Sequence, residues 1–159
     1  MEIKVKETGS KEEKYEHLTK SVASLVEGET DLIANLANIT ALVKDTFGFL
    51  WVGFYLVKNN ELVLGPFQGP LACTRIKKGK GVCGTSWEKA ETIIVPDVEK
   101  FEGHIACSSK SKSEIVVPLI KNGNVIGVLD IDSEYLSTFD SIDESYLNKI
   151  ATVVEKCFF

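Results

Sequence analysis

The sequence predicts an α+β domain built around a central antiparallel sheet, and three observations lead to this class. Two stretches near the start and one at the end have apolar residues at helical spacing. The middle of the chain is rich in β-branched and aromatic residues, and Asn122-Gly123 between two apolar runs is a strong hairpin signal. Strands paired as hairpins are antiparallel, and the N- and C-terminal helices can pack together on one face of their sheet.

Two helices are predicted before the first strand. From Lys11 to Glu27 the apolar residues follow helical spacing, and Gly28 then breaks the pattern. Thr30 is predicted to cap a second helix, because a threonine side chain can accept a hydrogen bond from the first turn. Gly48 is predicted to end this second helix.

The next segment changes to the pattern of strands. Residues 49–57 and 61–64 flank a Lys-Asn-Asn turn, and this arrangement predicts a hairpin. A loop rich in glycine and proline follows, to about Gly81. Residues 84–90 are predicted to form a short helix.

Three further strands and one helix complete the predicted domain. Pro96 stops the first of these strands, since proline cannot donate to a ladder of backbone hydrogen bonds. Asp140 can cap the last helix, with Asp143 in its first turn. The strands cover residues 92–95, 114–120 and 124–131, and residues 97–113 form a loop.

Length and charge narrow the classes of function. At 159 residues the chain suits one core, so residues 1–10 are predicted to be a flexible lead-in and residues 11–159 a single domain. The net charge is −5 and Arg75 is the only arginine, which argues against nucleic acid as a partner. No apolar run approaches the ~20 residues of a membrane span, and the charged N-terminus lacks the apolar core of a signal peptide. We therefore expect a cytoplasmic protein.

Three cysteines, Cys73, Cys83 and Cys107, lie in polar, glycine-rich segments, each of which is predicted to be an exposed loop. Cys157 instead falls on the apolar face of the last helix, as a packed thiol would. In a reducing compartment such cysteines often serve as reactive thiols. A zinc site formed with His104 is disfavoured, because the spacing lacks the close Cys-x₂-Cys pair. No metal site is predicted, and His104 is expected to be an ordinary loop residue.

Glu114, Asp130 and Asp132 form an acidic cluster if the second hairpin folds as predicted. Asp130 and Asp132 are two residues apart on one strand, so their side chains share a face. Crowded carboxylates raise one another's pKa, so one of them can stay protonated near neutrality and act as a general acid. The others can accept hydrogen bonds from a substrate ammonium group, and which acid has which role stays open. Trp51 and Tyr55 also share a strand face.

The order of these elements resembles a GAF domain, from about residue 15 to the C-terminus. The motifs are similar to those of the free methionine-(R)-sulfoxide reductases: the three spaced cysteines together with Trp51-Val-Gly-Phe-Tyr55, Ser113-Glu-Ile-Val-Val-Pro118 and Gly127-Val-Leu-Asp-Ile-Asp-Ser133. The joint match is specific, because most GAF domains are ligand sensors without this set of thiols. Fold alone would not imply an enzyme.

The resemblance implies a role for each candidate residue. Cys107 is the nucleophile that attacks the sulfoxide, Cys73 is the resolving cysteine, and Cys83 is an alternative resolving thiol or a relay. Packing explains Cys83 about as well, and which of the two cysteines forms the first disulfide stays open. Trp51 and Tyr55 line the substrate pocket, whereas the residues alone would favour simple core packing.

The resemblance also implies a reaction and its partners. Free L-methionine-(R)-S-oxide is reduced to L-methionine through a cysteine sulfenic acid and an intramolecular disulfide. No cofactor is bound, and an external dithiol, thioredoxin, reduces the disulfide at the ultimate expense of NADPH. GAF domains often pair through helices, so a homodimer is a further expectation. The alternative function is that of a GAF-type small-molecule or redox sensor without turnover.

Overall fold

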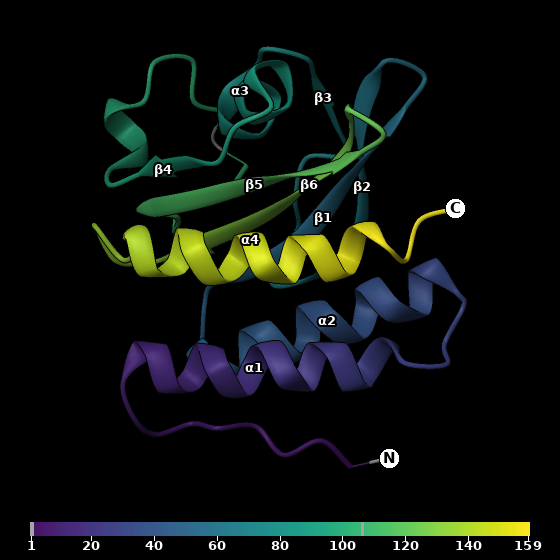
Figure 1. Ribbon diagram of the computed structural model, residues 1–159. Helices are drawn as coiled ribbons and strands as arrows, with labels where there is room; N and C mark the ends of the chain where they lie inside the picture. The colour runs from purple at the N-terminus through teal and green to yellow at the C-terminus, as the bar shows by residue number, and fades with distance from the viewer. Residues whose placement is uncertain (1, 106) are drawn as a thin grey trace.

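A six-stranded antiparallel sheet with helices on both faces forms the architecture of the computed structural model, which describes residues 2–105 and 107–159 (Figure 1). The helices are α1 (Lys11–Val26), α2 (Leu32–Phe47), α3 (Gly81–Lys89) and α4 (Ser141–Glu155), with a 3₁₀ turn η1 (Val98–Lys100). The strands are β1 (Trp51–Lys58), β2 (Glu61–Gln68), β3 (Arg75–Lys77), β4 (Ile93–Val95), β5 (Ser113–Lys121) and β6 (Asn124–Ser133). Among the described residues no helix is long and apolar enough to cross a membrane.

The strands lie in the order β3-β2-β1-β6-β5-β4, which confirms the predicted α+β class and the antiparallel sheet. β1 and β6 are the central pair, and their ladder joins the two predicted hairpins. The N- and C-terminal helices α1, α2 and α4 lie on one face, as predicted, and α3 lies on the other (Figure 1). α1 packs on α2 and α4 and forms the outermost layer on its side.

The ends of the helices follow local chemistry. α2 ends at Gly48, whose φ of 70° is the left-handed conformation that glycine favours. Asp140 and Asp143 form a capping box at the start of α4, which confirms that predicted N-terminus. Thr30 was the wrong cap for α2, because Asp31 accepts the hydrogen bond from the first turn. The Asp31 carboxylate is also the better partner for the positive end of the helix.

Two element boundaries and one short strand differ most from the prediction. β2 continues to Gln68, four residues beyond the predicted end, and α3 begins at Gly81 rather than at residue 84. β3 lies in a segment predicted to be loop, since Arg75–Lys77 is too short and too charged to show an apolar alternation. It pairs only with β2, at the edge of the sheet, where short charged strands are common.

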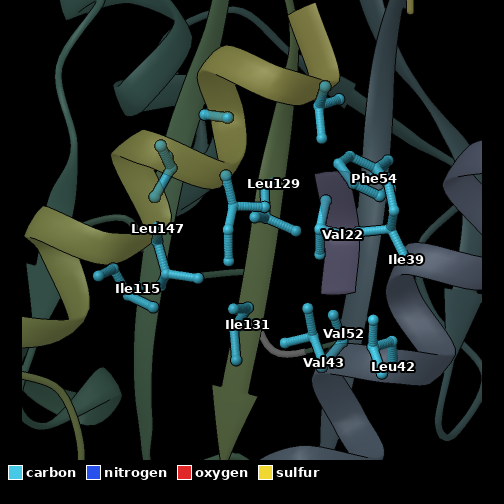
Figure 2. Close-up of a cluster of buried hydrophobic side chains, with 14 of the residues drawn as sticks. Val22, Ile39, Leu42, Val43, Val52, Phe54, Ile115, Leu129, Ile131 and Leu147 are labelled. Atoms are coloured by element: carbon cyan, nitrogen blue, oxygen red, sulfur yellow. The ribbon is translucent and has the colours of Figure 1, made fainter. Parts of the chain in front are cut away.

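Strand alternation sorts the side chains into two cores. On β6, Leu129 and Ile131 face α4 and the other helices of the main core (Figure 2). Asp130, which lies between them in the sequence, faces the opposite side and lines a pocket there. Phe54 on β1 and Ile115 on β5 lie in the same layer. The apolar faces of α1 and α4 are used in this core. The second, smaller core lies beneath α3 and includes Trp87, Val116 and Val128.

The predicted lead-in has no helix or strand over residues 2–10, and residue 1 lies outside the described part of the chain. Ile3 and Val5 pack against the main core. Residue 106, in the predicted loop 97–113, likewise lies outside the described residues.

Candidate active site

The three predicted acids converge on the face of the sheet that α3 covers. The register pairs Trp51 on β1 with Asp132 on β6, and Asp132 with Glu114 on β5. Asp130 lies opposite Gly53, two residues further along the same strands and therefore on the same face. The hairpin signal and the alternation of strand side chains thus predicted the cluster correctly.

Burial makes this cluster chemically unusual. Glu114 and Asp130 are only 5% and 6% exposed, and Asp132 is half-buried and accepts a hydrogen bond from the Ser111 hydroxyl at 2.7 Å. Burial, followed by the neighbouring charge of Asp130, raises the pKa of Glu114 and of Asp132 well above the ordinary values. Burial also raises the pKa of Asp130, against the opposing effect of hydrogen bonds with Glu114 and Cys83. Burial thus favours the protonated form of all three carboxyls, which is the direction that the sequence predicted for crowded acids.

Cys83 lies beside the acids, on α3 rather than in an exposed loop. The loop prediction was wrong for this cysteine, because Gly81–Lys89 forms a helix that covers the sheet. Burial, and then the charge of Asp130, raises the pKa of the Cys83 thiol well above its ordinary value. Its sulfur and one carboxylate oxygen each from Glu114 and Asp130 all lie within 4.8 Å of one another.

Cys73 and Cys107 are joined in a disulfide, with their Cα atoms 5.6 Å apart. The bond links the loop after β2 to the loop after η1, across 34 positions in the sequence. Among the described cysteines, Cys83 and Cys157 are free thiols. Of the two partners left open for Cys107, this structure therefore pairs it with Cys73.

Trp51 and Tyr55 form an aromatic wall on the same face as the acids. Their rings stack with centroids 5.9 Å apart, and both side chains are buried. The Trp51 indole donates a hydrogen bond to the Pro70 carbonyl at 3.1 Å, and the Tyr55 hydroxyl donates to the Cys73 carbonyl at 2.9 Å. Gly53 permits this arrangement, because a Cβ atom there would collide with the Trp51 ring. The wall thus positions the loop that carries Cys73.

A pocket of about 590 Å³, counted to its open mouth, brings these groups together. Its walls include the acid cluster, Cys83, Cys107, Trp51 and Tyr55. Leu71 and Ile105, each two residues before a cysteine of the disulfide, also line the pocket and are 90% and 38% exposed.

His104 also lines this pocket, which its expected role as an ordinary loop residue did not anticipate. Its Nε2 atom lies 3.9 Å from Oε2 of Glu114, and burial lowers the pKa of the ring. The sequence analysis also did not predict that Ser111 donates a hydrogen bond to Asp132 or that Gly53 makes room for the Trp51 ring. The only sequence signal for His104 was its place three residues before Cys107, which does not show that the loop folds back over β5.

Comparisons with known proteins bear on the family and the fold of the chain. The sequence profile of the GAF domain matches residues 31–158. "GAF domain-containing protein A" of Dictyostelium discoideum is 64% identical over 92% of this chain and 94% of its own. The free methionine-R-sulfoxide reductase of Escherichia coli is 45% identical over 92% of this chain and 90% of its own. The X-ray structure of free methionine-R-sulfoxide reductase from Neisseria meningitidis in complex with its substrate superposes with a TM-score of 0.95, at 52% identity, over 99% of this chain and 96% of that one.

Proposed function

The chain belongs to the GAF domain family, and we propose that it reduces free L-methionine-(R)-S-oxide to L-methionine. One observation carries the proposal: the Cys73–Cys107 disulfide lies at a pocket that also holds buried carboxyls with raised pKa values. A thiol pair and a proton donor are the two requirements for removing the oxygen of a sulfoxide. The names of the similar bacterial proteins support the choice of substrate and epimer.

The proposed reaction begins in the reduced protein, where the Cys107 thiolate attacks the sulfur of the sulfoxide. A protonated carboxyl of Glu114, Asp130 or Asp132 gives its proton to the departing oxygen, since all three have raised pKa values. The thioether leaves as methionine and the oxygen stays on Cys107 as a sulfenic acid. The Cys73 thiolate then attacks that sulfur, water leaves, and the disulfide seen in the structure is formed.

Substrate binding is proposed to use two parts of the pocket, the aromatic wall and the acid cluster. The stacked rings of Trp51 and Tyr55 provide an apolar surface for the methyl-thioether end. Ionised carboxylates of the cluster accept hydrogen bonds from the ammonium group, which a methionine within a peptide lacks. This pairing supports a free amino acid as the substrate.

Recycling is proposed to require thioredoxin, with electrons ultimately from NADPH, and no bound cofactor, in the cytoplasm. The disulfide lies at an open pocket whose exposed lining residues, Leu71 and Ile105, give a protein dithiol an apolar surface to contact.

Cys83 remains a candidate alternative resolving thiol or relay. Cys83 lies on the buried side of α3, next to the acids. Such a role therefore requires the loop of Cys73 or of Cys107 to move towards it.

The homodimer remains a prediction. The apolar faces of α1 and α4 are used within the core of the single chain, so they do not argue for a dimer. Sedimentation of the purified protein at micromolar concentration tests it.

A single-turnover experiment tests the proposed function. Fully reduced protein is mixed with one equivalent of free methionine (R)-sulfoxide, without added reductant, and the products are quantified with a peptide map of the disulfides. We expect one methionine and one Cys73–Cys107 disulfide per chain, and in Cys73→Ser a sulfenic acid on Cys107 that dimedone traps. Saturable binding without methionine formation would instead support the sensor function.

A further inference from the structure

We propose that the pocket also binds a thiophilic divalent cation of the zinc class, held by Cys83, Glu114 and Asp130, and that this cation excludes the sulfoxide. The metal binding does not depend on the proposed reductase function, whereas the exclusion of the sulfoxide rests on it. The cation would act as an inhibitor of the pocket rather than as a cofactor.

The three donors already lie close to the geometry of a metal site. Their ligand atoms are within 4.8 Å of one another, and all three residues are buried. Zinc bonds of about 2.0–2.3 Å in a tetrahedral arrangement hold ligand atoms roughly 3.5 Å apart. Movements on the order of 1 Å would therefore bring the donors onto one ion, which side-chain rotation can supply.

A second observation points to a missing ligand. Oδ1 of Asp130 is buried and has no hydrogen-bond partner in the part of the chain that the structure describes. Buried polar atoms are nearly always paired, so an unpaired carboxylate oxygen inside a cluster of acids is a vacant acceptor. A cation would satisfy it and would also balance the negative charge that Glu114 and Asp130 carry when ionised.

The donor set selects the class of cation. One sulfur and two carboxylate oxygens suit Zn²⁺ and Cd²⁺, whereas Mg²⁺ and Ca²⁺ prefer oxygen ligands alone. His104 Nε2 lies 3.9 Å from the Glu114 carboxylate but outside this group of three, so it would have to move closer to act as a fourth ligand. On binding, the Cys83 thiol and any protonated carboxyl release their protons to solvent, because the metal ligands must be deprotonated.

This set of ligands differs from that of the zinc site which the sequence analysis disfavoured, in which His104 joined the three loop cysteines. That site needed Cys73 and Cys107, which the disulfide occupies. Cys83 is free in the same oxidised state, so the proposed site is complete when the enzyme cannot turn over. Because the same carboxylates line the pocket, a bound cation and the sulfoxide cannot occupy it together.

Metal titration of the untagged, oxidised protein tests the proposal. Cd²⁺ is added while the ultraviolet absorption of thiolate-to-cadmium charge transfer is followed, and Zn²⁺ affinity is measured against a chromophoric chelator. We expect one ion per chain, no cadmium–thiolate band in Cys83→Ser, and at least tenfold weaker Zn²⁺ binding in Glu114→Gln. Mg²⁺ in excess should compete with neither ion.

Cys157→Ser is the matched control, since it removes the other free thiol, at the far end of the chain. It should keep the cadmium band and the Zn²⁺ affinity of the parent. A band that persists in Cys83→Ser and disappears in Cys157→Ser would overturn the proposal, as would unchanged Zn²⁺ affinity in Glu114→Gln. Circular dichroism checks that each variant is folded. Zn²⁺ binding that leaves sulfoxide binding to the oxidised protein unchanged would overturn the exclusion.

Discussion

Asp130 shows how a single residue is held where it is chemically useful and thermodynamically unfavourable. Its neighbours Leu129 and Ile131 are fully buried in the main core, and this fixes which face Asp130 occupies. A slip of one residue in the pairing of β6 would place two leucine-sized side chains in the pocket and the acids in the core. The core thus holds a carboxyl in a site where burial raises its pKa.

We predict that Asp130→Asn stabilises the protein at pH 7.5 by about 0.5–2 kcal/mol while it impairs sulfoxide reduction. The folded pKa lies above the ordinary value of 3.8, so the folded state binds more protons than the unfolded state. Stability is therefore lost as the pH rises from about 4 towards the folded pKa, and the asparagine variant avoids this loss. Urea unfolding at pH 5 and pH 7.5 measures the difference.

The gain in Asp130→Asn should be larger at pH 7.5 than at pH 5. The matched control is Asp45→Asn, because Asp45 is an exposed aspartate on α2. It should leave both stability and turnover unchanged. If Asp130→Asn is less stable than the parent at pH 7.5, the buried Asp130 carboxyl does not destabilise the folded protein and the prediction is wrong.

At the scale of elements, a buried polar group joins the first helix to the last. Asp143, at the start of α4, accepts hydrogen bonds from the Tyr15 hydroxyl at 2.5 Å and from Lys11 at 2.7 Å, both on α1. The same carboxylate completes the capping box with Asp140, at the helix end where negative charge is favoured. One side chain therefore caps α4 and links it to a helix more than 120 positions away.

Tyr15→Phe is predicted to destabilise the protein by about 1.5–3 kcal/mol, the usual range for a hydrogen bond to a charged group. The ring stays in the core, so the change isolates the hydroxyl. Turnover per folded molecule should not change, because α1 lies on the face of the sheet away from the pocket. Urea unfolding measures the loss, with Tyr146→Phe as the control.

Tyr146 is suited to that comparison because its ring stacks on Tyr15 while its hydroxyl lies at the surface, 3.4 Å from Glu16. Its removal should alter the free energy of unfolding by less than about 0.5 kcal/mol. Equal losses in the two variants would mean that the Asp143 interaction does not contribute specifically.

At the scale of the whole molecule, stability and chemistry occupy opposite faces of one sheet. The main core, between the sheet and α1, α2 and α4, contains neither Cys73 nor Cys107. The disulfide joins two loops on the other face, where Cys73 packs against the smaller core under α3. The loops can therefore change their redox state without rearrangement of the helical layers.

We predict that reduction of the disulfide leaves the protein folded but lowers its free energy of unfolding by about 2–4 kcal/mol. Opening a cross-link that spans 34 positions increases the entropy of the unfolded chain. Urea unfolding with and without a phosphine reductant measures the loss, and the double variant Cys73→Ser/Cys107→Ser should not respond to the reductant. Loss of structure on reduction alone would contradict the prediction.

The parts of the fold that could be predicted depend on local signals. Asp140, Gly48 and the Asn122-Gly123 turn each specify a helix end or a hairpin from a few neighbouring residues, and each was confirmed. The alternation of β6 likewise placed Asp130 and Asp132 on one face. These features need no knowledge of distant contacts.

The parts that could not be predicted depend on contacts between distant segments. Cys83 is buried because a glycine-rich segment becomes a helix only where it packs over the sheet. His104 approaches Glu114 because the disulfide and the loop after η1 bring it back over β5. Nor does any local pattern show that Gly53 makes room for the Trp51 ring.

The most direct test of the central claim is the consumption of racemic free methionine sulfoxide by the reduced protein with dithiothreitol, resolved by epimer. We predict loss of the R epimer alone, with a rate that falls more than about 1000-fold in Cys107→Ser, as expected when a nucleophile is removed. Cys157→Ser should retain the parent rate, since that thiol lies outside the pocket. Consumption of neither epimer, or an unchanged rate in Cys107→Ser, would contradict the proposed function.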